Sequence, residues 1–526
     1  MSWDHGYFSH ASYIRGYFRE TTPSWIDFAA LVKGVTPGRL EEGLPFSYLD
    51  LGCGTGYGLC MLAALYPEGT FVGVDFLPVH IAEAEALAKR LGLSNIRFLE
   101  ADFLALAGDL STVSSNHTTS PRFDYVVSHG VATWVVHPVQ RALLSTAAAA
   151  LRPGGLFYCS YNCLPGWLGR TSLHRLITHE RRRSDPSSAL LATRRAAATL
   201  ESLLSTPEEP SLLANALPLL RDELTYLQKQ DPTYLSQEYA NDGWQPLYVD
   251  EFHERCHAEK LSYIGPANFS ELFPQLLSNQ LKKLLQEEPS PFLRELMVDL
   301  ATNKGFRYDI FSRGPCPLPP GQRARLLARL AVRQQEAPET ENYEFRTSYG
   351  KLTGDLEVYK TIEAHFADGP RSLSSLPEWE SNPENLFTQI GLLLHGGRLG
   401  LDRGQPGRAA SQICEQVNRE LEQLREEGII FEWRLASCIG QAVFVSTQEQ
   451  LMAQGLAEGL EGELLASCLL MELASRGIQI TDQDGHPIKK TATQINTLQE
   501  GIDRFISQRF GYLRSLGMYN KSSSQC

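Results

Sequence analysis

A glycine-rich turn near the start of the chain constrains the fold most. The apolar run of residues 46–51 predicts a buried strand, and residues 59–66 predict a helix. Gly52, Gly54 and Gly56 lie between them. Glycines allow a sharp reversal and let a ligand lie against bare main chain, and the first N–H groups of the helix would face that ligand. The sequence therefore predicts a strand, a ligand-binding turn and a helix.

The residues around this turn indicate which ligand it binds. A dinucleotide-binding turn needs glycine at its first, third and sixth positions, and Tyr57 occupies the sixth. Asp50, two residues before the first glycine, would repel a pyrophosphate and attract a cationic amine. S-adenosylmethionine (SAM) has such an amine and no phosphate. The order hydrophobic-Asp-x-Gly-x-Gly-x-Gly thus resembles motif I of the class I SAM-dependent methyltransferases, and a purely structural glycine turn is the alternative.

Acidic residues follow the next predicted strands. Asp75, followed by Phe76, ends a strand at the distance expected for a ribose-binding acid. Asp102 and Phe103 match the position that holds the adenine amine and ring face in the methyltransferase family. Any one of these acids could be a helix cap or a surface group, but ligands of parallel sheets bind outside the carboxyl ends of the strands. Further strands are predicted at residues 70–75, 96–100, 123–128 and 156–161.

His129 and Trp134 follow the fourth strand, where a class I enzyme places groups beside the departing methyl. His129 could accept a proton, orient the target atom, or be a satisfied imidazole beside the adenosine. Trp134 is either core or substrate wall. Tyr13 and Tyr17 lie in an aromatic N-terminal segment that either covers the bound cofactor and contributes catalytic hydroxyls or only packs on the sheet. Further candidates for a substrate wall are Asn162, Trp167, Asn241, Trp244 and Tyr248.

Several longer sequence segments resemble a second, narrower group of proteins. The segments 3–23, 129–134 and 158–167, then 241–248 and 303–314, are similar to bacterial methyltransferases with a methyltransferase regulatory domain. That group includes protein-lysine methyltransferases acting on outer-membrane proteins. The resemblance covers most of the chain. It implies SAM as cofactor and a protein amino group as acceptor.

A class I sheet needs two more strands after the fifth, the last of them antiparallel. Residues 261–265 and 306–311 predict these strands, so that the regulatory region would partly complete the catalytic sheet. We therefore expect an α/β protein with a Rossmann-like seven-stranded sheet, a helical insertion and a mainly α C-terminal region. The predicted units are a helical lid (1–45), the SAM-binding core (46–170), the insertion (171–248), the end of the sheet (249–315), a winged-helix-like module (321–405) and a helical domain (406–526).

The winged-helix-like module follows a proline-rich linker, residues 315–320. Helical runs at 357–366 and 386–394, followed by a tight hairpin at 396–401, have the order of a winged helix. The stretch 378–387, which would contact DNA, is acidic and would be repelled by phosphate. We therefore expect this module to dock a protein.

Composition excludes several other classes of function. The chain has 526 residues and a net charge of −13, which opposes a broad nucleic-acid footprint and suits a basic partner. No apolar run reaches the roughly 18 residues that span a bilayer, and the start lacks the features of a secretory signal. We expect a cytoplasmic protein without membrane insertion. His253 and His257 are one helical turn apart but have no third ligand in view, so no metal is expected.

Three functions fit these residues. The first is methylation of protein amino groups, and the second is methylation of a small molecule or a modified peptide. The third is SAM binding by a regulator without catalysis, which would keep Asp50 and Asp75 but would not require His129. Methyl transfer needs alignment and exclusion of water rather than an obligatory nucleophile or metal.

Overall fold

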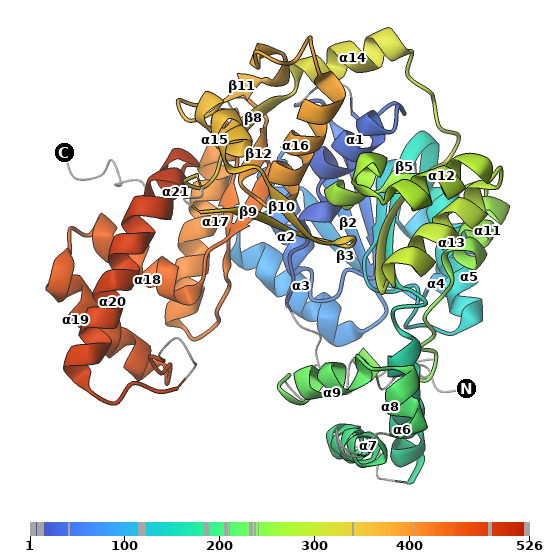
Figure 1. Ribbon diagram of the computed structural model, residues 1–526, viewed down its shortest axis with the longest axis horizontal. Helices are drawn as coiled ribbons and strands as arrows, with labels where there is room; N and C mark the ends of the chain where they lie inside the picture. The colour runs from blue at the N-terminus through green and yellow to red at the C-terminus, as the bar shows by residue number, and fades with distance from the viewer. Residues whose placement is uncertain are drawn as a thin grey trace.

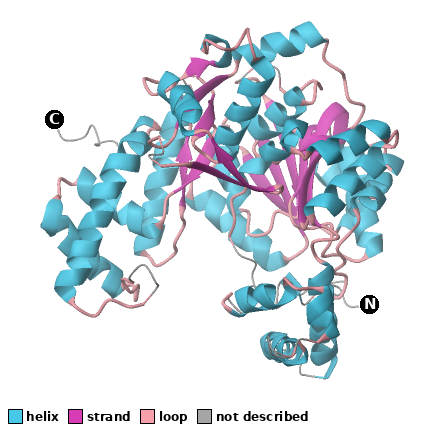
Figure 2. Cartoon of the chain, in the orientation of Figure 1, coloured by secondary structure: helices cyan, strands magenta, loops and turns pink. Residues whose placement is uncertain are grey.

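A computed structural model describes residues 7, 15–39, 41, 43–113, 122–183, 189–204, 209, 211–230, 235, 238–239, 241–338, 341–404, 407–481 and 486–519. A seven-stranded sheet with helices on both faces lies at its centre (Figures 1 and 2). The strand order is β3-β2-β1-β4-β5-β7-β6. The strands are β1 (Phe46–Leu51), β2 (Gly69–Asp75), β3 (Ile96–Glu100), β4 (Phe123–Ser128), β5 (Leu151–Asn162), β6 (Ser262–Pro266) and β7 (Phe306–Ser312).

The sheet confirms the predicted class I methyltransferase fold. The first five strands are parallel, whereas β7 runs antiparallel to both β5 and β6. The regulatory region thus supplies the last two strands, as the sequence predicts. Because β7 lies between β5 and β6, its first residue, Phe306, comes next to Asn162 at the carboxyl end of β5.

Alternation along the strands builds a core on each face. In β1, Phe46 and Tyr48 belong to one apolar cluster, and Leu49 and Leu51 belong to the other. Helices cover both faces (Figure 1). They are α1 (Pro23–Val32), α2 (Tyr57–Leu65), α3 (Pro78–Arg90), α4 (Phe103–Leu106), α5 (His137–Ala150), α11 (Val249–Ala258), α12 (Asn279–Glu287) and α13 (Pro291–Thr302).

The predicted insertion is helical and projects from the carboxyl end of the sheet (Figure 1, green). Its apolar side chains form a cluster that includes Trp134 and Trp167, so the insertion packs against the ends of β4 and β5. Its helices are α6 (Leu168–Arg183), α7 (Ala189–Leu203), α8 (Leu212–Ala216) and α9 (Leu220–Gln228).

The C-terminal part is joined to the catalytic sheet more closely than the sequence suggests. The cluster that contains Tyr48 and Tyr66 continues through Val332, Leu399 and Leu421. In addition, the Tyr66 hydroxyl donates to the Gly440 carbonyl at 2.9 Å. This part therefore packs on α2, directly behind the glycine turn, instead of being attached by the proline-rich linker alone.

The predicted hairpin at residues 396–401 is not what this segment forms. Leu399–Asp402 is a single strand, β12, that pairs with β8 (Ala331–Gln334) across the intervening helices. A hairpin occurs earlier, between β9 (Tyr343–Thr347) and β10 (Gly350–Gly354). Neighbouring elements are α14 (Pro320–Arg329), α15 (Leu356–His365), β11 (Arg371–Ser372) and α16 (Pro383–His395). The winged-helix assignment and the unit boundaries stay predictions.

The remaining C-terminal residues are largely helical, as the sequence predicts. A short hairpin, β13 with β14, interrupts the helices, and a separate apolar cluster holds the last helices together. The elements are α17 (Arg408–Glu426), β13 (Trp433–Ala436), β14 (Gln441–Phe444), α18 (Thr447–Ala457), α19 (Gly462–Ser475), α20 (Thr491–Phe505) and α21 (Gly511–Ser515). Within the described ranges, no helix combines the length and the apolar character needed to cross a membrane.

Candidate active site

A cavity of about 390 Å³ lies at the carboxyl ends of β1 to β5. Parallel strands deliver their following loops to this edge, which explains why residues far apart in sequence meet there. Most of the predicted site residues line it. They are Asp50, Gly52, Gly54, Asp75, Phe76, Asp102, Phe103, His129, Trp134, Asn162 and Trp167.

The three glycines of the turn share a positive φ but differ in the space around them. All have positive φ, at +90° for Gly52, +54° for Gly54 and +71° for Gly56. A Cβ on Gly52 would lie 2.4 Å from Val131 Cγ2, and one on Gly56 would lie 2.5 Å from Ala84 Cβ. A Cβ on Gly54 would meet no atom within 4 Å. Gly56 therefore allows close packing behind the turn, whereas Gly54 leaves bare main chain for a ligand.

Asp50 and Asp75 form an acidic end of the cavity. Burial raises the pKa of Asp50 to about 7, and the nearby charge of Asp75 adds to this rise. A ligand ammonium would lower the pKa of Asp50 again, because it places a positive charge beside the carboxylate. This environment fits the predicted amine of SAM. It would disfavour a phosphate.

Asp75 also holds the turn together. Its Oδ2 accepts from Gly54 N at 3.0 Å, and its Oδ1 accepts from Leu77 N at 2.9 Å. His80 Nδ1 lies 3.2 Å from the same Oδ1. The predicted ribose-binding acid is therefore fixed by the main chain around it. Its remaining lone pairs are available for ligand hydroxyls.

Asp102 and Phe103 start α4 at the neighbouring strand end. The Asp102 side chain caps this helix by accepting from Leu104 N at 2.8 Å, and the Phe103 ring is buried in the sheet core. Capping was the alternative considered for any of the acids. Both residues nevertheless line the cavity, so their predicted adenine contacts stay a prediction.

His129 lies in an aromatic environment. Its ring stacks on Phe18 with a centroid separation of 3.6 Å, and its Nδ1 lies 2.9 Å from the Tyr158 hydroxyl oxygen. Phe306 and Tyr308 complete the surroundings at 6.2 and 6.3 Å. Burial lowers the pKa of His129 to about 3, so the imidazole is neutral near pH 7. Such a weak base is better suited to orient a neighbour than to hold a proton.

Of the two predicted N-terminal tyrosines, the structure describes only Tyr17. Tyr13 lies outside the described residues. Tyr17 is buried away from this cavity, where its hydroxyl oxygen accepts from Ala442 N at 2.9 Å and its ring lies 5.1 Å from that of Trp433. Tyr17 thus attaches the N-terminal segment to the C-terminal part. Its neighbours Gly16 and Phe18 reach the cavity instead.

Three of the predicted substrate residues lie behind the cavity wall. Trp244 packs on Trp167 with ring centroids 5.4 Å apart. The Asn241 carbonyl oxygen is 3.1 Å from His174 Nε2. Tyr248 precedes α11 and is half-buried there. None of these three residues lines the cavity, and Trp244 packs on Trp167, which does.

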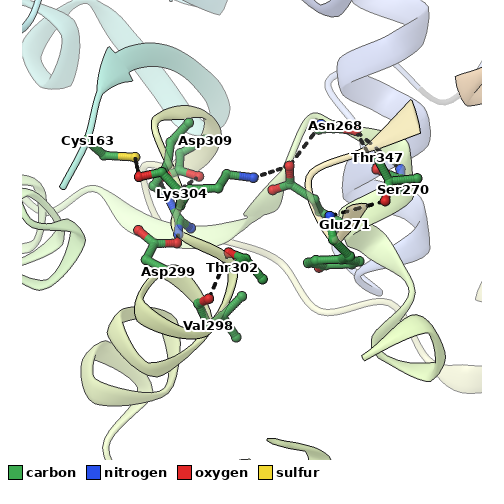
Figure 3. A network of polar contacts seen from close by, with 12 residues as sticks. Cys163, Asn268, Ser270, Glu271, Val298, Asp299, Thr302, Lys304, Asp309 and Thr347 are labelled. Atoms are coloured by element: carbon green, nitrogen blue, oxygen red, sulfur yellow. Dashed lines mark hydrogen bonds and ion pairs between the residues drawn. The ribbon is translucent and has the colours of Figure 1, made fainter. Parts of the chain in front are cut away.

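The regulatory region fixes another part of this wall. Figure 3 shows Lys304 directed toward Glu271, and Asn268 Nδ2 donates to the same carboxylate at 2.8 Å. The Lys304 carbonyl accepts from Gly166 N at 2.8 Å, next to Trp167. This pairing holds the end of β5 against the start of β7. Phe306 and Trp167 therefore reach the cavity together.

The histidine considered as a metal ligand belongs to a buried ionic network. His253 Nε2 lies 2.8 Å from Asp309 Oδ2, and Arg307 Nε donates to the same oxygen at 2.9 Å. Burial alone would raise the pKa of Asp309, but Arg307 and His253 hold it well below its usual range. Among the described residues, no group of three potential ligands could hold a metal ion.

Sequence reasoning missed several residues of the cavity. Tyr7, Phe18, His80, Glu238 and Phe306 line it. Glu238 is 7% exposed, and its Oε1 lies 3.5 Å from Asn162 Nδ2. Glu238 stands in no motif and at no strand end, so only the folded chain reveals its position, whereas Tyr7 lies in the aromatic N-terminal segment that the sequence singles out. His80 was detectable in principle, because it lies one turn into the helix that follows Asp75.

Comparisons with known proteins agree with this geometry. A family model described as a methyltransferase domain matches residues 46–207, and one described as a predicted methyltransferase regulatory domain matches residues 231–313. An uncharacterized protein of Synechocystis is 29% identical over 379 residues, which are 72% of each chain. Trans-aconitate 2-methyltransferase of Methylobacterium nodulans is 32% identical over 26% of this chain and 45% of its own length.

A solved structure is similar over nearly the whole chain. The structure of PKMT2 from Rickettsia typhi in complex with AdoHcy has a TM-score of 0.68 and 19% sequence identity. The similarity covers 95% of this chain and 99% of that chain. The shared architecture thus includes the insertion and the C-terminal part, and not only the central sheet.

Proposed function

We propose that this chain, a class I SAM-dependent methyltransferase, transfers methyl groups to amino groups of proteins, chiefly to lysine side chains. The observation that carries the proposal is the extent of the likeness to PKMT2, a protein lysine methyltransferase, which reaches 95% of this chain. By contrast, the likeness to trans-aconitate 2-methyltransferase is confined to 26% of it. The parts outside the central sheet are therefore shared with an enzyme that acts on proteins.

The residues of the cavity suit the cofactor half of this reaction. We assign Asp50 to the ammonium group of SAM, Asp75 to the ribose hydroxyls, and Asp102 with Phe103 to the adenine. The open main chain at Gly54 would lie against the ligand. SAM supplies the methyl group in electrophilic form when it is bound, so the protein has to orient the acceptor and exclude water.

The aromatic part of the cavity lining, which we call the acceptor wall, suits a lysine. It includes Phe18, Trp134, Trp167 and Phe306. A lysine reacts only as the neutral amine, and removal from water lowers its pKa toward that form. Apolar rings around the acceptor nitrogen would therefore favour the reactive state. The net charge of −13 would also favour a basic protein acceptor.

A small-molecule acceptor is the second candidate. It is favoured by the 32% identity with trans-aconitate 2-methyltransferase over the central part of the chain, since the same cofactor site serves both kinds of acceptor. An acidic acceptor such as a carboxylate would need a cation in the acceptor wall. The described residues that line the cavity include no lysine or arginine, and Arg170, whose charge reaches Glu238, pairs with Glu223 at 3.5 Å.

The deciding experiment uses SAM labelled in the methyl group. The full chain is incubated with labelled SAM and a bacterial lysate, and protein is separated from small solutes. We expect the label in protein and, after acid hydrolysis, in methylated lysine. Label that migrates only with small solutes would refute the proposed acceptor and support the second candidate.

A further inference from the structure

Glu238 is a buried carboxylate in the acceptor wall that the cofactor does not require. We infer that it binds the ammonium group of the acceptor and takes up the proton that the amine must lose; this inference rests on the proposed amino acceptor. It assigns to this reaction a residue from the end of the helical insertion. Glu238 lies at the start of the segment that matches the regulatory-domain model, residues 231–313.

The position of Glu238 separates it from the acids of the cofactor end. Its Oε1 lies 3.5 Å from Asn162 Nδ2, at the carboxyl end of β5. Asp50 and Asp75 instead lie at the carboxyl ends of β1 and β2, on the other side of β4 in the strand order. His129, which follows β4, lies between the two groups in the order of strands. One end of the cavity therefore offers carboxylates to the cofactor, and the other offers a separate carboxylate to the acceptor.

The surroundings of Glu238 favour a carboxylate that can gain and lose a proton near neutral pH. Burial raises its pKa to about 7, whereas the hydrogen bond from Asn162 and the charge of Arg170 on α6 oppose this rise. Burial raises the pKa of the Tyr7 hydroxyl in the N-terminal segment, and the nearby charges of Asp75 and Glu238 add to this rise. Arg170 is partly engaged elsewhere, because its guanidinium lies 4.5 Å from the Trp167 ring centre and pairs with Glu223.

His129 is less suited to this proton. Its pKa of about 3 makes the imidazole a weaker base than the Glu238 carboxylate by several orders of magnitude. An efficient general base has a pKa near the working pH. Glu238 satisfies that condition, as does Asp50, which we assign to the cofactor, whereas His129 is suited to hold the aromatic wall in place.

The proton moves in two steps, first from the acceptor to Glu238 and then from Glu238 to water. One proton passes from the acceptor ammonium nitrogen to a Glu238 carboxylate oxygen, which leaves a neutral amine with a free lone pair and a neutral carboxyl group. After the methyl group has been transferred, the methylated nitrogen is cationic and the carboxyl releases its proton to water. The ionised carboxylate is then ready for the next acceptor.

The test compares Glu238→Gln with Asp222→Asn, a matched loss of one carboxylate on the exposed surface of α9 in the same insertion. Glutamine keeps the size of the side chain and can still contact Asn162. Calorimetry with AdoHcy-loaded full-length protein measures the binding of n-butylammonium, a lysine side-chain analogue. We expect at least tenfold weaker binding in Glu238→Gln and no change in Asp222→Asn. Equal binding of the analogue by Glu238→Gln and the unsubstituted chain would overturn the inference.

Kinetics with a lysine acceptor give an independent result. We expect kcat/KM of Glu238→Gln to fall by about 100-fold, the lower range for loss of a general base, while the SAM dissociation constant changes less than twofold. In the unsubstituted chain kcat/KM should rise with pH and level off above about 7, because ionised Glu238 is required. Glu238→Gln should lose this step and rise with pH toward the pKa of lysine itself.

The two proposals fail in different ways. If the unsubstituted chain labels no protein amino group, the proposed function is refuted. If it labels lysine and Glu238→Gln has the same kcat/KM and the same pH profile, only the role of Glu238 is refuted. A Glu238→Gln protein that binds SAM more than tenfold more weakly would also overturn the inference, because Glu238 would then be a cofactor contact.

Discussion

The cavity end that we assign to the cofactor comes from one continuous run of chain, Asp50 to Phe103, whereas the end that we assign to the acceptor combines His129, Asn162 and Glu238 from three separate segments. At the cofactor end, main-chain hydrogen bonds fix the side chains, as between Asp75 and Gly54 N. At the acceptor end, aromatic packing fixes them, as between His129 and Phe18. Contacts within one stretch of chain thus hold the proposed cofactor end, whereas contacts between distant segments hold the proposed acceptor end.

This difference also explains the role of the added parts of the chain. The insertion and the regulatory region contribute Glu238 and Phe306 to the proposed acceptor end. The C-terminal part instead packs behind α2 through Tyr66 and Gly440. Variation in the insertion could thus change the acceptor without disturbing the cofactor loop. The following substitutions test whether the two ends are separable in this way.

The largest effect on the cofactor end is expected for Gly52→Ala. At φ +90° an alanine is strained by ~1–3 kcal/mol, and its Cβ would displace Val131. We expect the SAM dissociation constant, measured by calorimetry, to rise about 100-fold. Gly43→Ala is the control, because Gly43 has a similar φ of +79°, is exposed outside the cavity, and its Cβ would meet no atom within 4 Å. Unchanged affinity in Gly52→Ala would show that the turn adapts and that its glycines do not define the cofactor end.

A smaller effect should follow from lowering the pH. Asp50 has a pKa of about 7 in the free protein, raised chiefly by burial, and a bound ammonium must lower it. Below pH 7, SAM binding therefore requires release of a proton, so affinity should fall by up to about tenfold per pH unit as the pH decreases. Above pH 7 it should be constant until the ammonium group of SAM itself loses its proton. Calorimetry of Asp50→Asn should give weaker binding that no longer varies in this range; the same pH dependence in both proteins would exclude Asp50 as the cause.

His129→Ala should affect the acceptor end more than the cofactor end. The substitution removes the ring that stacks on Phe18 and contacts Tyr158, so we expect kcat to fall about tenfold through lost orientation. The SAM dissociation constant should change less than threefold. The pH profile should keep its shape, because His129 is already neutral near pH 7. A greater loss of SAM affinity than of kcat would instead identify His129 as a cofactor contact.

The cofactor end was predictable because local rules specify it. Strand, glycine turn and following acid lie within a few tens of residues, and the chemistry of Asp50 discriminates between ligands. The two late strands were also predictable. The first five strands leave a class I sheet two strands short, and residues 306–311 alternate in polarity as a strand does. In both cases the sequence pattern of a short segment is enough to predict its structure.

The acceptor end was predictable only in part. Asn162 ends β5, and Trp134 and Trp167 lie a few residues beyond β4 and β5, so their place in the cavity lining follows from the strand ends. The position of Glu238 depends instead on the path of a helical insertion, and so does that of Trp244, which packs in the cluster with Trp167 and does not line the cavity. The hairpin expected at residues 396–401 was replaced by β12, because pairing with the distant β8 outweighed the local turn signal.

The smallest effect on catalysis is expected for Tyr17→Phe. The sequence predicts a catalytic hydroxyl, but the folded chain uses that oxygen to accept from Ala442 N in the buried contact between the N-terminal segment and the C-terminal part. Loss of the acceptor leaves a buried N–H unpaired, which should lower the free energy of unfolding by ~1–3 kcal/mol. We expect kcat to change less than twofold and the denaturant midpoint to decrease. A tenfold lower kcat at unchanged stability would instead restore the catalytic role and show that the N-terminal segment serves the acceptor end directly.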